Sequence, residues 1–331
     1  MGGAGAKERA DGGCRDGVEE KSRGLQAALG LESLANNGLS RHQKFWPGSI
    51  HTVGKTSREC ILGGNLCVIR GLSTGKRSAM SSVFLRKIER FACLSDEEKR
   101  LVRQVGAQRA RLLGPRQDIT SEGEQARSVK ILEAGWACRC RMLPDGRRQI
   151  VALLLPGDAC DFDAVAPAPL DHSVTTLTSV SLREIPHEAF EAMLVAHPRL
   201  REARWRDHML AAAIQREWMV SLGQRNARER VAHLLCEAMA RLELVGLADG
   251  KVCDFPLTQI DLGEATGLSS VHVNRTLQEL RGGGLVRLRD RQLQIADFEA
   301  LAEIGLFEPS YLLPMCPAVE PPSRARQASP A

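Results

Sequence analysis

The sequence lacks any long apolar run. No stretch of its 331 residues approaches the roughly 20 consecutive apolar residues that a transmembrane helix requires. The N-terminus also lacks the apolar core of a signal peptide. We therefore expect a cytoplasmic protein with no membrane partner, whose ten cysteines are reduced thiols.

Catalytic signatures are missing as well. The chain contains no nucleophile elbow, no phosphate-binding loop and no series of metal ligands. We accordingly expect neither an enzyme nor a bound cofactor. The net charge is only +5, because 40 Asp and Glu nearly balance 45 Lys and Arg. The length and the 43% hydrophobic content nevertheless allow about two domains with real cores.

Residues 257–295 carry the most informative pattern. Thr258 is a good N-cap, since its hydroxyl can accept an orphan backbone N–H of the first helical turn. The helix that follows should stop at Gly267, because only glycine enters the left-handed conformation at little cost. Ser269 then caps a second predicted helix, 270–280, which ends at three glycines. This arrangement predicts a helix-turn-helix.

The second of these helices has an apolar and a polar face. The apolar side comprises Val273, Thr276, Leu277 and Leu280. The polar side offers groups that can reach base edges in a major groove of double-stranded DNA. The predicted DNA-binding residues are Thr258, Ser269, Ser270, Val271, His272, Asn274, Arg275, Gln278 and Arg287.

Two short β-prone runs follow directly, 285–288 and 292–295, joined by 289–291. They predict a β-hairpin, which makes the motif a winged helix-turn-helix. Residues 256–311 hold five arginines against eight acids, so positive charge is local to the second helix and the hairpin. Phosphate contact requires such a local patch and not a high overall charge.

With this motif the chain resembles the Crp/Fnr family of transcription regulators, from about Val83 to Tyr311. The resemblance implies an α+β fold: a cyclic-nucleotide-binding-like β-roll sensor domain over 80–196, a dimerisation helix over 197–224 and a winged helix-turn-helix domain over 225–311. It also implies a homodimer on palindromic promoter DNA, an effector that acts at the β-roll, and RNA polymerase as a further partner.

The sensor region has its own strand pattern. Trp136, Cys138, Cys140 and Met142 alternate with other residues at the period of a strand. A turn at 144–147 leads into a second run, 149–155, and further short runs follow at 174–177 and 180–185. Short strands at even spacing with Gly and Pro turns predict a barrel or jelly-roll-like sheet.

The effector site departs from the family pattern. Members that bind cyclic nucleotides begin a phosphate cassette with Gly-Glu and end it with Arg-Ser. Here these positions resemble Gly157-Asp158 and His172-Ser173. A neutral imidazole does not offer the charged planar fork that suits a phosphate, so we do not expect cAMP to bind. The pocket either takes another effector or is vestigial, and we expect His172 to be a surface or loop histidine.

A long helix is predicted over 197–222, apolar on more than one side. Its recurring apolar positions include Leu210, Ile214 and Trp218, which we predict to form a seam between two subunits. The alternative is a helix buried wholly within one chain. A second amphipathic helix, 226–244, should be the scaffold of the DNA-binding domain.

The cysteines have no closely spaced N-terminal cluster of the kind that holds an iron–sulfur centre in oxygen-sensing family members. Cys138 and Cys140 share a sheet face, which is compatible with a metal pair and equally with two small core residues. We expect structural cysteines and no metal site. Haem stays open as an alternative, although nothing in the sequence argues for it.

The two ends of the chain have a different composition. Residues 1–79 are rich in Gly, Ser and charge without a sustained apolar period, which predicts a disordered leader. An alternative is that translation begins at Met80. Residues 312–331 are predicted to be a disordered tail.

Three functions remain to be compared. The first is an effector-switched transcription regulator. The second is a DNA-binding protein that acts without ligand and keeps a vestigial sensor domain. The third, an enzyme with an accessory DNA-binding domain, has no catalytic motif in its favour.

Overall fold

The structure is a computed structural model that describes residues 60–62, 65–67, 83–106, 110–160, 169–249 and 251–312. Strands β1 (Cys60–Leu62) and β2 (Asn65–Cys67) pair antiparallel in a unit spanning Gly30–Met80. This hairpin is the described part of the predicted leader, so that segment is not wholly without secondary structure. The rest of the leader, Met80 and residues 313–331 lie outside the described residues. All other described residues belong to the unit that contains Ser81–Ala331.

Two short helices precede the sensor sheets, α2 (Val83–Ile88) and α3 (Asp96–Gly106). The start of α3 is fixed by a reciprocal cap. The Glu98 backbone N–H donates to the Ser95 hydroxyl at 3.2 Å, and the Glu98 carboxylate accepts from the Ser95 backbone at 2.7 Å. Acidic residues in the first turn also favour this helix start.

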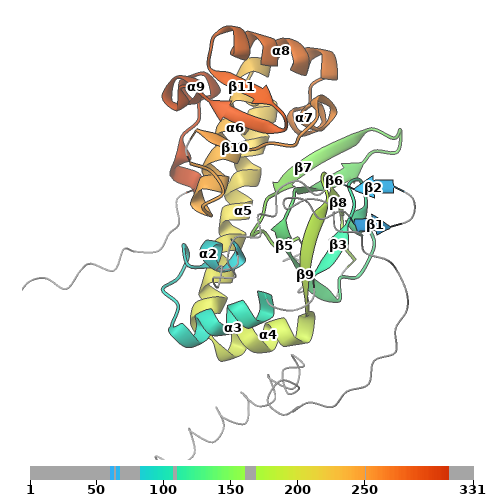
Figure 1. The fold of residues 1–331 in the computed structure, drawn as a ribbon, viewed down its shortest axis with the longest axis vertical. Coiled ribbons are helices and arrows are strands. Elements are labelled where there is room, and N and C mark those ends of the chain that lie inside the picture. Colours follow the sequence, from blue (N-terminus) through green and yellow to red (C-terminus); the bar gives the residue numbers. More distant parts are fainter. Residues whose placement is uncertain are drawn as a thin grey trace, which may run out of the picture. The chain divides into compact units, whose positions relative to one another are not determined.

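The sensor domain is built from two antiparallel sheets, as the strand pattern predicted (Figure 1). Their strands are β3 (Arg111–Leu113), β4 (Asp118–Thr120), β5 (Ser128–Ala134), β6 (Ala137–Met142), β7 (Arg148–Leu154), β8 (Ser173–Thr176) and β9 (Val180–Pro186). One sheet has the order β3-β9-β5 and the other β4-β8-β6-β7. Apolar side chains such as Ile119, Leu132 and Val174 form a buried cluster between them.

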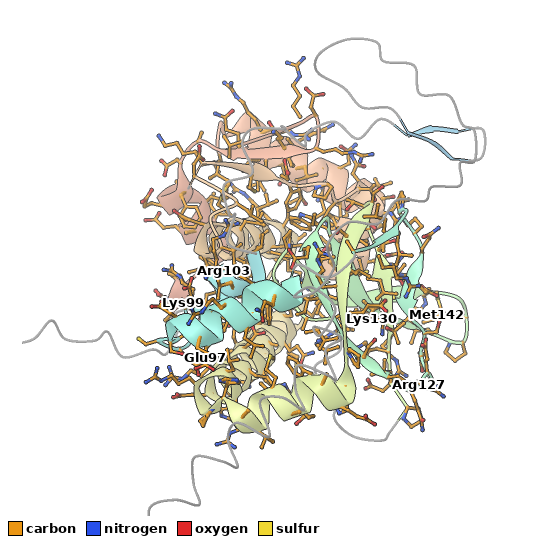
Figure 2. The ribbon with its side chains drawn as sticks, turned by 60° about the horizontal axis from the view of Figure 1, so that its bottom comes forward. Glu97, Lys99, Arg103, Arg127, Lys130 and Met142 are labelled. Carbon is orange, nitrogen blue, oxygen red and sulfur yellow. The ribbon has the colours of Figure 1, made fainter. Side chains whose placement is uncertain are left out.

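Strand β6 is buried on both faces over most of its length. Ala137 contributes to the cluster between the two sheets. Cys138 and Cys140 point to the other side and join a second hydrophobic core, which also includes buried residues of the DNA-binding domain. Met142, labelled in Figure 2, is exposed near the hairpin tip. The sensor sheet therefore packs directly on the DNA-binding domain.

Three helices connect the domains: α4 (His187–Ala196), α5 (Pro198–Gln224) and α6 (Ala227–Leu244). Figure 1 shows α5 running from α4 toward the DNA-binding domain. Asn226 begins α6 with a capping box that it shares with Glu229. Helix α6 is the most buried of these three helices, which agrees with its predicted role as a scaffold.

The C-terminal domain adds β10 (Val252–Asp254), α7 (Gln259–Thr266), α8 (Ser270–Gly282), β11 (Val286–Arg289), β12 (Gln292–Ile295), α9 (Phe298–Gly305) and the 3-10 helix η3 (Pro309–Leu312). Strand β10, which the sequence pattern did not predict, pairs with β12 and completes a three-stranded sheet. Leu312 is buried in the core, so the fold extends to that residue and the boundary predicted for the tail is corrected. None of the described helices combines the length and the hydropathy that crossing a membrane requires.

Candidate nucleic-acid interface and sensor site

The helix-turn-helix forms where the local signals predicted it. The Thr258 hydroxyl caps α7 and shares a capping box with Asp261, and Gly267 ends the helix with φ of 69°. Ser269 caps α8 by accepting from the His272 backbone N–H at 3.3 Å. Gly263 was missed by sequence reasoning: a Cβ there would lie 2.5 Å from the Leu268 carbonyl oxygen. Glycine is required where the turn passes this close to α7.

Helix α8 separates its residues as predicted. Its buried residues are Val273, Thr276, Leu277 and Leu280. The helix continues two residues beyond the predicted end, to Gly282. On the other side Ser270, His272 and Gln278 are exposed. Val271 is 78% exposed, and the Arg275 side chain is 72% exposed.

Three of the predicted DNA-binding residues make side-chain hydrogen bonds within the protein. The Thr258 hydroxyl donates to the Asp261 carboxylate at 2.6 Å. The Asn274 amide oxygen accepts from Gln259 at 3.3 Å, which joins α8 to α7. Ser269 is occupied as the cap of α8. Among the described residues, the partner found for the Arg275 side chain is the neighbouring Glu279 carboxylate, 3.6 Å away on the same exposed face.

The wing is a tight hairpin. Val286 pairs with Ile295 and Arg289 with Gln292. Asp290 and Arg291 form the turn with φ of 53° and 61°, the left-handed conformation that a two-residue hairpin turn favours. Arg287 and Arg289 are exposed on β11, so the wing carries guanidinium groups at its surface.

The sensor domain contacts α7 through polar groups that the sequence did not reveal. Arg116 lies 2.7 Å from one Asp261 carboxylate oxygen and donates to the other at 3.0 Å. Gln149 donates to the Glu264 carbonyl oxygen at 2.6 Å, and Arg148 lies 3.7 Å from the Glu264 carboxylate. These contacts join residues more than a hundred positions apart in the chain, which no local pattern could predict.

Asp158, predicted to contact the effector, instead belongs to a buried ionic cluster. Lys87 lies 2.6 Å from both Asp158 and Asp207. Arg241 lies 2.8 Å from Asp158 and 3.3 Å from Glu237. Burial by itself raises the pKa of Asp158, but Lys87 and Arg241 outweigh it and hold the pKa below its usual value.

The Asp158 carboxylate is therefore already satisfied within the fold. It also accepts from the Leu155 backbone N–H at 2.7 Å, next to a cavity of about 80 Å³ that residues of β7, α5 and α6 line. Gly157 has φ of 96° and packs against Val83. The assignment of Asp158 as an open effector contact is corrected accordingly.

At the other end of the proposed cassette, His172 lies in the loop directly before β8, which agrees with the expectation of a loop histidine. It is not a surface residue, because it is only 8% exposed. Its Nδ1 lies 2.7 Å from Asp171, whereas its Nε2 is buried without a hydrogen-bond partner among the described residues. The Ser173 hydroxyl accepts from the Glu122 backbone N–H at 3.0 Å. The cassette residues thus sit in ordered, partly enclosed surroundings.

Two buried cations of the roll were missed by sequence reasoning. Lys130, labelled in Figure 2, donates to the Thr120 hydroxyl at 3.1 Å. Arg139 donates to the Cys160 carbonyl at 3.2 Å. The residues are 5% and 7% exposed. Lys130 is two positions from Leu132, and Arg139 two positions from Ala137, so each cation shares a strand face with an apolar residue of the cluster between the sheets. Both cations therefore lie on the inner face of the roll.

The predicted dimer seam requires a correction. Ile214 and Trp218 are 6% and 7% exposed and pack in the core of the single chain, with Leu210 against them. The Trp218 indole donates to the Glu237 carboxylate on α6 at 3.1 Å. Apolar periodicity located these residues in a core but could not tell which core they entered.

The described cysteines follow the structural expectation in part. Cys138, Cys140, Cys160, Cys236 and Cys253 are buried and Cys93 is exposed, all as free thiols. Across the described ranges, no group of three or more His, Cys, Asp or Glu side chains is arranged to hold a metal ion.

Comparisons with known proteins match both halves of the chain. Residues 229–304 match the Crp-like helix-turn-helix domain, and residues 110–197 match the cyclic nucleotide-binding domain. The transcriptional activatory protein AadR of Rhodopseudomonas palustris is 32% identical over 200 residues, which cover 57% of this chain and 79% of that protein. FnrL of Cereibacter sphaeroides, a transcriptional activator protein, is 28% identical over 191 residues, 56% of this chain and 76% of that protein.

A solved structure shows the same fold. FixK2 from Bradyrhizobium japonicum is 26% identical, with a TM-score of 0.53 over 60% of this chain and 98% of that one. A β-sheet sensor domain, a long helix and a winged helix-turn-helix define a class of DNA-binding regulators. Within that class, the chain belongs to the Crp/Fnr family of transcription regulators. Its relatives and its fold are those of regulators and not of enzymes.

Proposed function

We propose that the chain acts as a homodimer that places one α8 helix in each of two successive major grooves of a palindromic promoter site. The observation that carries this proposal is the open face of α8, which is exposed and carries Arg275, together with the exposed arginines of the wing that follows it in the chain. Helix-turn-helix dimers bind half-sites about one helical turn apart, because the two-fold axis of the protein matches that of the site.

Within this proposal the α8 residues have different roles. Arg275 is the residue for bidentate contact with a guanine, and Val271 offers apolar contact to a thymine methyl. Ser270, His272 and Gln278 lie beside them, while Arg287 of the wing contacts phosphate. Thr258, Ser269 and Asn274 support the helix positions through the hydrogen bonds described above.

The second copy is proposed to pack on the exposed side of α5. Trp205, Met209 and Met219 are 60%, 40% and 72% exposed. Their spacings of four and ten residues place them on one face of the helix. An apolar stripe of this kind on a long helix is the typical seam of a two-helix interface. This face replaces the one that contains Ile214 and Trp218.

The effector is proposed to be an anion that enters the β-roll. Lys130 and Arg139 supply two buried positive charges in its wall, and His172 adds a ring nitrogen that lacks a partner among the described residues. cAMP is not the expected anion, because Asp158 is occupied by Lys87 and Arg241. Calorimetry with cAMP should show no heat at millimolar ligand. Micromolar binding that is lost in His172→Ala would contradict this.

Asp158 also favours a second candidate function. Its carboxylate is where the family resemblance places the contact to a ribose hydroxyl, yet here it stabilises the junction between the sensor, α2 and α6. A regulator that binds DNA without any ligand would keep the β-roll for this structural purpose. DNA affinity that stays constant across a screen of anionic metabolites would favour that alternative.

RNA polymerase as a partner and a cytoplasmic location remain predictions from the sequence.

The salt dependence of binding tests the DNA interface without knowledge of the target site. Affinity for duplex DNA should fall as salt rises, because phosphate contacts release counterions. Arg287→Ala should reduce the slope of log affinity against log salt by about 1.8, which is about 0.9 for each of the two subunits. Arg111→Ala, on the sensor domain, is the matched control and should leave the slope unchanged. Two results would contradict the proposal: no DNA binding at low salt, or the same salt slope in Arg287→Ala as in the wild type.

A further inference from the structure

Strand β6 places two thiols side by side on the sensor face that meets the DNA-binding domain. Cys138 and Cys140 are separated by one residue, so both side chains leave the strand on the same side. Cys138 is 0% exposed and Cys140 6%. Both belong to the core in which the Trp136 and Phe255 rings meet edge to face, 5.6 Å apart.

A cation lies against this pair. The Arg148 guanidinium on the neighbouring strand β7 donates to Cys138 Sγ at 2.9 Å, and its side chain is 15% exposed. The Thr175 hydroxyl lies 3.6 Å from Cys140 Sγ. A guanidinium next to two adjacent thiols favours the loss of one proton from the pair, and the thiolate is the nucleophilic form of cysteine.

The pKa values of the two thiols depend on each other. A hydrogen bond from the Cys138 thiol lowers the pKa of Cys140 to about 5, with Thr175 and Arg148 acting in the same direction. The same hydrogen bond, together with burial, raises the pKa of Cys138. Cys236, which has no such partner, shows the effect of burial alone, a pKa raised to about 12. The pair therefore gives up its first proton readily, and Cys140, the more exposed of the two thiols, is its nucleophilic member.

We propose that Cys138 and Cys140 form a hydroperoxide-reactive dithiol whose oxidation alters the contact between the sensor and DNA-binding domains. The Cys140 thiolate attacks one oxygen of hydrogen peroxide. An S–O bond forms, the O–O bond breaks, and the leaving hydroxide takes a proton to become water. The Cys138 sulfur then attacks the sulfenic sulfur, and the hydroxyl leaves with the thiol proton as a second water. The dithiol loses two electrons and the peroxide gains them.

Closing this disulfide must deform the strand. Residues i and i+2 of a strand lie about 6.6–6.8 Å apart between Cα atoms, at the upper end of the roughly 4.4–6.8 Å that disulfides span. Oxidation also removes the thiolate next to Arg148. Because Arg148 and Gln149 contact Glu264 of α7, both changes reach the first helix of the helix-turn-helix.

Peptide mass mapping of the full chain tests the chemistry. Trypsin cuts after Arg139, so an internal bridge would join peptide 131–139 to dipeptide 140–141. After a low stoichiometric dose of hydrogen peroxide and alkylation of the remaining thiols, this linked species should appear in the wild-type protein. Cys236 and Cys253, buried thiols whose pKa is raised to about 12, should be recovered reduced and serve as internal controls.

Two variants assign the roles. Cys138→Ser should trap a sulfenic acid at Cys140 that reacts with dimedone, whereas Cys140→Ser should leave Cys138 reduced at the same dose. Arg148→Gln should slow oxidation several-fold, since it removes the cation nearest the pair. Cys138→Ala and Cys140→Ala repeat the assignment in case serine in this core impairs folding. Oxidation of Cys236 or Cys253 at the same rate as Cys140, or no linked peptide in the wild type, would overturn the inference.

The effect on DNA binding rests on the proposed function and is measured separately. Peroxide should change the DNA affinity of the wild type by at least several-fold, dithiothreitol should restore it, and Cys140→Ser should not respond. A bridge that forms without a change in affinity would contradict the coupling. A reduced protein that binds no DNA would contradict the proposed function but leave the mass measurement as the test of the dithiol.

Discussion

Arg116 of the sensor domain contacts both carboxylate oxygens of Asp261, at 2.7 and 3.0 Å, and the same carboxylate accepts from the Thr258 hydroxyl at the start of helix α7. The Asp261 side chain is 2% exposed and that of Arg116 43%. One acidic residue therefore caps the first helix of the DNA-binding motif and links it to the sensor. Any rearrangement of the sensor near Arg116 is transmitted to the position of α7.

Loss of this link should be measurable. Arg116→Ala leaves the buried Asp261 carboxylate without its charged partner, which should lower the free energy of unfolding by about 1–2 kcal/mol in urea titration. Arg111→Ala removes a comparable pair with Glu184, 2.9 Å long but exposed on both sides, and should cost about 0–1 kcal/mol. If the two variants lost equal free energy of unfolding, the interdomain pair would stabilise the protein no more than an exposed surface pair does.

Assembly should depend on the exposed face of α5 and not on its buried face. Met219→Asp places a charge on a 72% exposed position, so the chain should fold normally and sediment as a monomer. Ile214→Asp places the charge in the core of the single chain and should instead lower the melting temperature sharply. Sedimentation and thermal melting of both variants separate the two effects. A folded Met219→Asp dimer at micromolar concentration would exclude this face as the seam.

The stability should fall in mild acid because of His233. Burial, and then repulsion from Arg225, lowers its pKa from 6.5 to about 4. As the pH falls below about 6.5, the unfolded chain takes up the proton first, so the free energy of unfolding decreases down to about pH 4. The contribution is about 2–3 kcal/mol. His233→Gln should flatten this part of the pH profile in urea titrations, and an unchanged profile would show that other groups cause the loss.

Base recognition should depend on Arg275. Arg275→Ala should weaken binding by about 1–3 kcal/mol for each half-site and relax the preference at one base pair of each half-site. Arg103→Ala, on α3 of the sensor domain and labelled in Figure 2, is a control that should leave affinity unchanged. Anisotropy titrations on the preferred site and on single-base variants measure both effects. Unchanged affinity and preference in Arg275→Ala would remove this residue from base reading.

The sequence predicted the elements whose causes are local. Thr258, Gly267 and Ser269 each fix the backbone within a few residues of themselves, and the turn, both helices and the wing appear where these residues place them. Strands β6 to β9 of the roll followed in the same way from alternation and turn residues, whereas the sequence pattern did not predict β3, β4 and β5. Strand β10 is too short for a periodic signal, and only its pairing with β12 defines it.

Features that depend on tertiary contacts were beyond the sequence. Apolar spacing showed that Ile214 and Trp218 are buried, but a helix with two apolar sides does not reveal which one faces its own chain. Asp158 was assigned by position, whereas its role is decided by Lys87 and Arg241, which lie 71 and 83 residues away in the chain. The contact of Arg116 with Asp261 spans 145 residues. Such pairs follow from the packing of the domains.

The central claim is that the chain reads a two-fold symmetric DNA site through α8, and selection of bound sequences from a random duplex library tests it most directly. The account predicts an enriched palindrome with half-site centres about 10–10.5 base pairs apart, and a loss of preference at one base pair of each half-site in Arg275→Ala. An unenriched library, or a single half-site without symmetry, would contradict the account.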